Sequence, residues 1–193
     1  MYRALVTIIR PFLKILFRIK IQGDRQLPEG PVVVIGNHTS DFDPFIVSIL
    51  FDRQIHWMAK KELFSNKILA YILEKVGAFP VDRKNNDIRS MRKAMSILKE
   101  GKVLGIFPEG TRVKTIDYTQ AKSGAALIAS RMGAKVVPIY IEGKIKPFSK
   151  ITVHRRPDLA LPSGKRTEEE YEKDMVGIMK NIYEGVQYDG NTP

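Results

Sequence analysis

The stretch PVVVIGNHTSDFDPF, residues 31–45, places a short apolar run directly before a polar loop. Residues 31–36 are the kind of β-branched run that forms a strand buried on both faces of a parallel sheet. The loop then brings His38, Asp41 and Asp43 within six positions of one another. Functional side chains of open α/β sheets gather at the carboxyl ends of strands, so this loop is the first candidate for a site.

The rest of the chain repeats this alternation of short apolar runs with longer helical patterns. The pattern predicts one α/β domain, with a mixed, largely parallel sheet flanked by helices. The expected strands are 31–36, 55–59, 102–107 and 135–141, a short one within 77–84, and a further one within 150–156. The expected helices are 62–76, 87–100, 121–132 and a last one that begins at a capping box, Thr167 to Glu170. A chain of 193 residues that is 44% hydrophobic can bury one sizeable core, and we place this domain at 23–193.

Residues 1–22 form a separate amphipathic segment that we expect to be helical and to bind a membrane surface. Residues 1–20 contain five basic residues and no acidic one. Arg3, Arg10, Lys14 and Arg18 fall within roughly 80° on a helix, which is typical of a helix that lies flat on lipid. The regular charges argue against a transmembrane span or a signal peptide. Pro11 allows one kinked helix or two short ones, and a helix packed on the core with a solvated basic stripe is the alternative.

Composition narrows the chemistry further. The chain has no cysteine, which excludes disulfides, a thiolate zinc site and a cysteine nucleophile. Its net charge of +11 favours anionic ligands such as phosphates or acidic lipids. We do not expect nucleic acid as a partner, because the sequence has no zinc-finger spacing, basic-zipper heptads or RNP signature.

Cationic side chains follow several of the other expected strands. Lys60 stands in MAKKELF, Arg83 in GAFPVDRK and Arg112 in FPEGTRVK. The guanidinium of Arg112 could hold a phosphate by two parallel hydrogen bonds. For each of these residues alone, however, a solvated surface charge is the more common role. Glu109 is interpreted as structural or orienting, within a Pro-Glu-Gly turn that also occurs at 28–30.

Several interpretations of the loop after the first strand remain open. Asp43 and Pro44 are also what a helix N-cap followed by proline would look like. His38, Asp41 and Asp43 could instead supply metal ligands, although too few ligand residues precede His38 for a dinuclear site. His38 could also be a histidine that only satisfies a turn.

Four blocks, taken in order over residues 23–143, resemble the 1-acyl-sn-glycerol-3-phosphate acyltransferase family of glycerolipid acyltransferases. They are HTSDFD at 38–43, preceded by Asn37, then GAFPVDR at 77–83, FPEGTR at 107–112 and VVPIY at 136–140. Asp41 stands where the family usually has a bulky aromatic or aliphatic residue.

The resemblance implies a reaction in which the free sn-2 hydroxyl of 1-acyl-sn-glycerol-3-phosphate attacks an acyl thioester and gives phosphatidic acid. A neutral imidazole at His38 suits the general base, and Asp43 would orient it. The resemblance assigns phosphate binding to Arg112, Arg83 and Lys60. Supporting roles go to Asn37, Glu109, Gly110, Thr111 and Pro138.

The resemblance implies no cofactor and no metal, with acyl-CoA or an acyl carrier protein as donor. We therefore expect a peripheral or monotopic enzyme on the cytoplasmic face of the cell membrane, in contact with anionic lipids. The alternatives are acylation of glycerol-3-phosphate or another lysolipid, a metal-dependent phosphoesterase, and a non-enzymatic protein that binds anionic lipid.

Overall fold

The computed structural model describes residues 2–82, 87–110, 117–143, 146 and 148–186. Arg83, Thr111 and Arg112, three of the expected site residues, lie outside the described residues.

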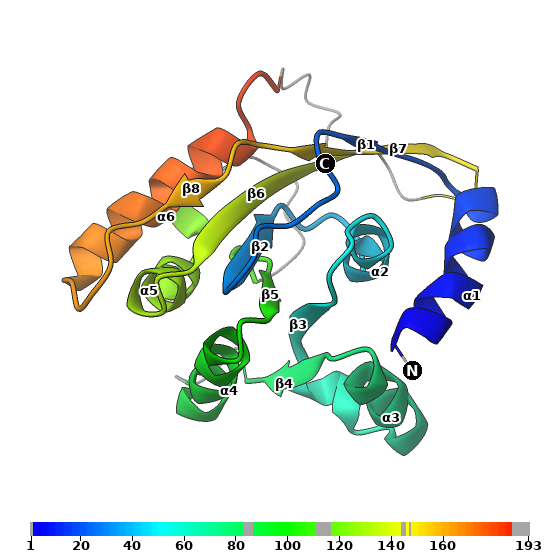
Figure 1. The fold of residues 1–193 in the computed structure, drawn as a ribbon, viewed down its shortest axis with the longest axis horizontal. Helices are drawn as coiled ribbons and strands as arrows, with labels where there is room; N and C mark the ends of the chain where they lie inside the picture. Colours follow the sequence, from blue (N-terminus) through cyan, green and yellow to red (C-terminus); the bar gives the residue numbers. More distant parts are fainter. Residues whose placement is uncertain (1, 83–86, 111–116, 144–145, 147, 187–193) are drawn as a thin grey trace.

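An eight-stranded sheet forms the centre of the molecule (Figure 1). Its strand order is β1-β7-β6-β2-β5-β3-β4, and the short β8 pairs with β6. The strands are β1 Arg18–Gln22, β2 Val32–Gly36, β3 Ile55–Lys60, β4 Phe79–Val81, β5 Val103–Ile106, β6 Lys135–Glu142, β7 Lys150–Arg155 and β8 Leu159–Ala160. Only the pairs of β6 with β7 and β8 are antiparallel, which confirms the predicted mixed, largely parallel sheet.

Helices cover both faces of this sheet (Figure 1). The α-helices are α1 Tyr2–Leu16, α2 Asp43–Ser48, α3 Lys67–Lys75, α4 Ile88–Lys99, α5 Gly124–Arg131 and α6 Glu168–Ile182. Two 3₁₀ turns, η1 Lys61–Phe64 and η2 Tyr118–Gln120, stand between them. One core cluster joins the sheet to α4, α5 and α6, and a second joins it to α1, α2 and α3.

The central strand β2 shows why the first quoted stretch decides the fold. Val33 contributes to the cluster under α4, α5 and α6, whereas Val32 and Val34 contribute to the opposite cluster. All three side chains are fully buried. Because successive side chains of a strand point to opposite faces, a strand covered on both sides must be apolar throughout.

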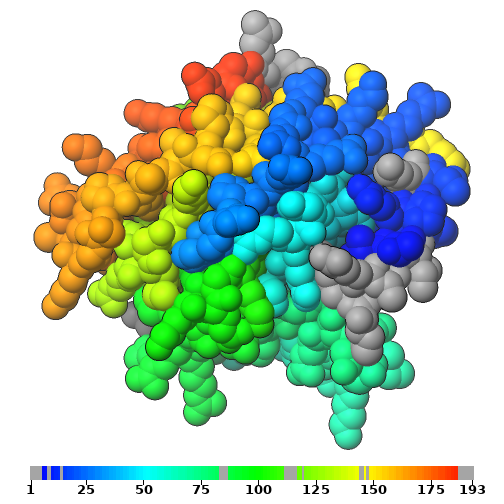
Figure 2. Space-filling model, in the orientation of Figure 1, coloured from blue at the N-terminus to red at the C-terminus, as the bar shows by residue number. Residues whose placement is uncertain are grey.

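The boundary expected at residue 22 needs correction. Helix α1 ends at Leu16 and runs through Pro11 as one helix, whereas Arg18–Gln22 is strand β1 and pairs in parallel with β7. Within β1, Ile19 and Ile21 are half-buried, and Arg18, Lys20 and Gln22 are exposed. This alternation of period two is a strand pattern, but the basic residues at helical spacing masked it. Strand β1 lies beside β7 at the surface (Figure 2).

The single helix expected at 62–76 is also wrong, because the structure has η1 followed by α3. The side chain of Asn66 accepts hydrogen bonds from the backbone N–H groups of Ile68 and Leu69 and so begins α3 anew. Most of the expected apolar face is exposed, including Ile68 at 76%, and Leu73 is the buried side chain of α3.

Pro138 stands in an interior strand, although a proline within a strand usually marks an edge strand or a bulge. Strand β6 lies inside the sheet, with β2 on one side and both β7 and β8 on the other. Pro138 falls between the residues that pair with β8 and those that pair with β7, and its carbonyl accepts the N–H of Arg156. The missing N–H of proline therefore falls at the gap between two short partner strands.

Candidate active site

The loop that follows β2 is tied to the neighbouring strand by Asn37. Its side-chain amide donates to the carbonyl of Ile141 at 3.0 Å and accepts the N–H of Ile141 at 2.7 Å. Asn37 is 1% exposed, so both hydrogen bonds are shielded from water. The side chain thus continues the pairing of β2 with β6 beyond the last strand residue and fixes where the loop begins.

His38 and Asp43 are bonded to each other at this edge of the sheet. His38 Nδ1 lies 2.9 Å from Asp43 Oδ2, and the Asp43 carboxylate is fully buried. A carboxylate is an acceptor, so a neutral imidazole donates from Nδ1 and keeps the lone pair on Nε2. That is the tautomer a general base needs.

Asp43 also holds the loop that carries His38. Its Oδ2 accepts the backbone N–H groups of Thr39 at 2.6 Å and Ser40 at 2.8 Å, and its Oδ1 accepts the Thr39 hydroxyl. Asp43 is not the N-cap of α2, because that position belongs to Phe42, which makes no side-chain cap bond. The carboxylate therefore points back at the histidine loop and not at its own helix.

A stack of aromatic rings holds the imidazole from the side. The rings of His38 and Phe107 lie 4.4 Å apart at 12°, and Phe107 lies 4.7 Å from Trp57 at 10°. The indole N–H of Trp57 donates to the Ser48 hydroxyl, which fixes the stack against α2. Glycine is needed at position 105, because a Cβ there would come within 2.5 Å of the Trp57 ring. This stack was not predicted from the sequence, where its signal is an aromatic residue at the end of an expected strand.

The Pro-Glu-Gly turn after β5 has the hydrogen bond that its sequence predicts. The N–H of Gly110 donates to the carbonyl of Phe107 at 3.1 Å, and Gly110 has a φ of +67°. This turn brings the Glu109 carboxylate back toward the loop of His38.

Glu109 accepts two hydrogen bonds in the interior. Its Oε2 accepts the backbone N–H of His38 at 3.0 Å, and its Oε1 accepts the hydroxyl of Tyr183 at 3.0 Å. Burial raises the pKa of Glu109 above its ordinary value, although the N–H of His38 and the Tyr183 hydroxyl oppose this shift. Burial and the nearby Glu109 charge also raise the pKa of Tyr183, which keeps its hydroxyl protonated and able to donate.

The structure brings Lys60 to the same edge of the sheet. Lys60 is the last residue of β3 and is exposed there, in register with Val81 at the end of β4. Strand β5, which leads to Glu109, lies between β3 and β2. The carboxyl ends of β2, β5 and β3 therefore carry His38, Glu109 and Lys60 in neighbouring loops.

Metal ligands are not clustered in the described part of the chain. No group of three or more His, Asp or Glu side chains close enough to share an ion occurs there.

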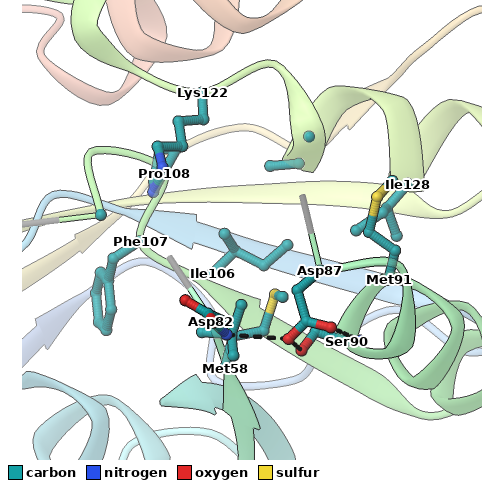
Figure 3. Close-up of a pocket in the computed structure, with 14 residues that line it drawn as sticks. Met58, Asp82, Asp87, Ser90, Met91, Ile106, Phe107, Pro108, Lys122 and Ile128 are labelled. Atoms are coloured by element: carbon teal, nitrogen blue, oxygen red, sulfur yellow. Dashed lines mark hydrogen bonds between the residues drawn. The ribbon is translucent and has the colours of Figure 1, made fainter. Parts of the chain in front are cut away.

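A pocket of about 200 Å³ is lined by Phe107, the central member of the ring stack (Figure 3). Phe107 lies at one end of it, and Met91 and Ile128 lie at the other. Met58 and Ile106 form more of its apolar lining, whereas its polar lining residues are Asp82, Asp87, Ser90 and Lys122. The Asp87 carboxylate accepts the N–H groups of Asp82 and Ser90, which lower its pKa to about 2. The pocket thus has both apolar and polar lining residues, and Phe107 connects it to the ring of His38.

A histidine bonded to a buried carboxylate, at the carboxyl edge of a largely parallel sheet, is an arrangement typical of α/β enzymes. Comparison with known proteins identifies the family. A family model described as Acyltransferase matches residues 18–142, and the chain belongs to this family.

Two relatives and one solved structure indicate how far the similarity extends. The chain is 33% identical over 179 residues to "1-acyl-sn-glycerol-3-phosphate acyltransferase" of Bacillus subtilis, covering 86% of this chain and 89% of that one. It is 32% identical over 113 residues to the protein of the same name from Streptococcus pneumoniae, covering 58% and 41%. The crystal structure of the 1-acyl-sn-glycerophosphate (LPA) acyltransferase PlsC from Thermotoga maritima has a TM-score of 0.71 and 22% identity. That match covers 93% of this chain and 78% of the other, and it confirms the fold.

Proposed function

We propose that the protein transfers an acyl chain from an acyl thioester to the sn-2 hydroxyl of 1-acyl-sn-glycerol-3-phosphate, which gives phosphatidic acid. The names of its relatives support this substrate. The observation that carries the proposal is the hydrogen bond between His38 Nδ1 and Asp43 Oδ2, because it leaves Nε2 able to accept a proton.

The residues can run this reaction without a covalent enzyme intermediate. The acceptor hydroxyl gives its proton to His38 Nε2 while its oxygen attacks the thioester carbonyl carbon. Asp43 stabilises the imidazolium that forms, as the carboxylate does in a serine hydrolase triad. When the tetrahedral intermediate collapses, the C–S bond breaks and the departing sulfur takes the proton from the imidazolium. The products are an ester and a free thiol.

We assign the acceptor phosphate to a cationic clamp of Arg112, Arg83 and Lys60. Arg112 is the principal member, because its planar fork can hold a phosphate by two parallel bonds. The exposed position of Lys60 at the end of β3 suits this role, and the net charge of +11 would attract the anion.

The donor in this proposal is acyl-CoA or an acyl carrier protein, and the reaction uses no cofactor and no metal. We place the acyl chain of the thioester in the pocket beside Phe107. Its lining by Met58, Met91, Ile106 and Ile128 suits a hydrocarbon chain, and Phe107 joins it to the ring of His38.

We further propose that α1 binds the protein to the cytoplasmic face of a membrane that contains anionic lipids. Phe12 is 65% exposed and Ile15 is 75% exposed, whereas Leu13 is buried and ties α1 to the core. Within the described residues, no helix is long and apolar enough to cross a bilayer. Exposed apolar side chains on α1 suit a peripheral contact.

The test is an assay with purified protein, 1-acyl-sn-glycerol-3-phosphate and an acyl thioester of either coenzyme A or acyl carrier protein. A thiol reagent reports the released thiol, and mass spectrometry reports phosphatidic acid. We expect equal amounts of both products, at a rate that EDTA does not change. Thiol without phosphatidic acid would indicate a thioesterase, and neither product with any acceptor would contradict an acyltransferase. Glycerol-3-phosphate and other lysolipids, run in parallel, test the choice of acceptor.

A further inference from the structure

Tyr183 is a buried residue that contacts the site although it lies far from it in the sequence. It follows the last residue of α6 and is 6% exposed. Its hydroxyl donates to Glu109 Oε1, and the other oxygen of Glu109 accepts the N–H of His38. Tyr183 lies outside the segment 18–142 that matches the family model.

We propose that Tyr183 is a positioning residue for the catalytic histidine. Its hydroxyl fixes the rotamer of Glu109, and Glu109 in turn fixes the backbone of His38 and so the place of the imidazole. This role rests on the proposed function, in which His38 is the general base.

The surroundings of Tyr183 make it a rigid support. Four side chains of α6, Tyr171, Met175, Ile178 and Met179, are nearly fully buried in the core. The ring of Tyr183 contacts Tyr140 at 5.6 Å and Tyr118 at 6.0 Å between centroids. Together these contacts leave the phenol little freedom to move.

Hydrogen bonds from a residue next to the sheet also hold the end of α6. The guanidinium of Arg156, just after β7, donates to the carbonyls of Ile182 and Glu184, on either side of Tyr183. Because contacts hold both the ring and the backbone of Tyr183, its hydroxyl has a fixed position. It can therefore fix the position of the Glu109 carboxylate, which a solvated side chain could not do.

The hydrogen bond itself matters for a physical reason. A buried carboxylate is stable only when donors surround it, and Glu109 is 8% exposed with the N–H of His38 and the hydroxyl of Tyr183 as its hydrogen-bond donors in the described part of the chain. Without the Tyr183 hydroxyl, Oε1 of Glu109 would lose its donor, and the carboxylate would rotate toward another one. The oxygen that holds the N–H of His38 would move with it.

The test compares Tyr183→Phe with Tyr171→Phe, a matched control in the first half of α6. The Tyr171 hydroxyl is also buried, donates to the carbonyl of Gly164 and accepts the N–H of Arg166. Both variants lose a buried phenol hydroxyl, but of the two side chains only that of Tyr183 contacts Glu109. We expect Tyr183→Phe to lower kcat about tenfold with KM for both substrates unchanged, because small displacements of a catalytic group mainly reduce turnover. Tyr171→Phe should lower Tm about as much as Tyr183→Phe does, but it should leave kcat unchanged.

Two further readouts separate positioning from general destabilisation. In the double variant with Glu109→Gln, Tyr183→Phe should have less effect on kcat than it has alone, because Glu109 carries the effect. The backbone amide of His38, followed by NMR, should exchange faster in Tyr183→Phe and keep its wild-type rate in Tyr171→Phe. The amide signal does not depend on activity, so it tests the link even if the wild type transfers no acyl chain.

The proposal is overturned if kcat of Tyr183→Phe stays within twofold of the wild type and the His38 amide is unaffected. It is equally overturned if Tyr171→Phe reduces kcat as much as Tyr183→Phe does.

Discussion

At the scale of single residues, the site depends on buried carboxylates that hold one loop. Asp43 binds the imidazole of His38 and the N–H groups of Thr39 and Ser40, and Glu109 binds the N–H of His38. Three consecutive backbone N–H groups, from 38 to 40, therefore donate to carboxylates, and Nδ1 of the His38 ring is bonded to Asp43. The loop is organised before any substrate arrives, which is the condition for efficient general-base catalysis.

Asp43→Asn should damage both catalysis and folding. An amide can turn an N–H group toward Nδ1 of His38, and the imidazole would then carry its proton on the wrong nitrogen. We expect kcat to fall by about 10² to 10⁴. Replacing a buried acceptor of several donors should also lower the free energy of unfolding by about 1–3 kcal/mol. Steady-state kinetics and denaturant melts measure the two effects, with Asp41→Asn, exposed in the same loop, as the control. Normal kcat for Asp43→Asn would show that Asp43 does not orient the base.

Glu109 should make stability depend on pH in a defined direction. Its pKa is raised above 4.5 in the folded protein, so the folded state holds this proton more tightly than the unfolded state. The stabilising contribution is complete below about 4.5 and is lost as pH rises through the raised value. The Tm advantage of wild type over Glu109→Gln should thus shrink as the pH rises above about 4.5. Thermal melts over a series of pH values measure it, and an advantage that grows with pH would mean that the folded protein lowers the pKa.

At the scale of the elements, α1 has two distinct surfaces. Leu13 is buried in the core cluster that joins the sheet to α1, α2 and α3, whereas Phe12 and Ile15 are exposed. In the view of Figure 1, α1 and α3 lie on the same side of the molecule, and α3 also exposes apolar side chains. An apolar surface of this kind is unusual on a protein that meets only water.

The double variant Phe12→Ser and Ile15→Ser should weaken binding to lipid vesicles. Each side chain buried in lipid contributes roughly 1.5–3 kcal/mol, so the affinity for anionic vesicles should fall at least tenfold. Vesicle flotation measures this, and the control is Ile88→Ser, which removes an equally apolar side chain, 61% exposed, from α4. Equal losses for both variants would mean that α1 is not the docking surface.

The pocket between β5, α4 and α5 should set which acyl chains the enzyme accepts. Met91→Trp adds bulk at the end opposite Phe107, so the longest chains should no longer fit. We expect kcat/KM for long-chain donors to fall about tenfold more than for short-chain donors, since each displaced methylene is worth about 1–3 kcal/mol. Kinetics with a series of acyl-CoA lengths measure this change, and Arg92→Trp, at an exposed neighbouring position, is the control. A uniform loss over all lengths would place the acyl chain elsewhere.

At the scale of the whole molecule, the sequence predicted the strands and the side-chain pair that local patterns determine. Buried parallel strands are short apolar runs rich in β-branched residues, and β2, β5 and β6 fall where such runs occur. Asp43 is five residues from His38, so their pairing needed no knowledge of the fold. The strand β1 and the break between η1 and α3 were missed, because helical spacing of charged or apolar side chains outweighed weaker signals.

Contacts across long separations could not be predicted in this way. Tyr183 and Glu109 are 74 positions apart and meet only because α6 packs beside β6. The stack of His38, Phe107 and Trp57 likewise joins the loops after β2 and β5 to the middle of β3, and these become neighbours only in the sheet. The roles of Lys60, Asn37, Gly110 and Pro138 in substrate binding or support stay predictions.

The account as a whole depends on His38 acting as the base that accepts the proton of the acceptor hydroxyl. The most direct measurement is the rate of phosphatidic acid formation by His38→Ala, with melting curves to confirm that it folds. The control is His56→Ala, which removes a half-buried histidine of β3 whose Nδ1 contacts the carbonyl of Val103. The account predicts that kcat of His38→Ala falls by about 10² to 10⁴, while His56→Ala turns over normally. A folded His38→Ala protein with near-normal turnover would contradict it.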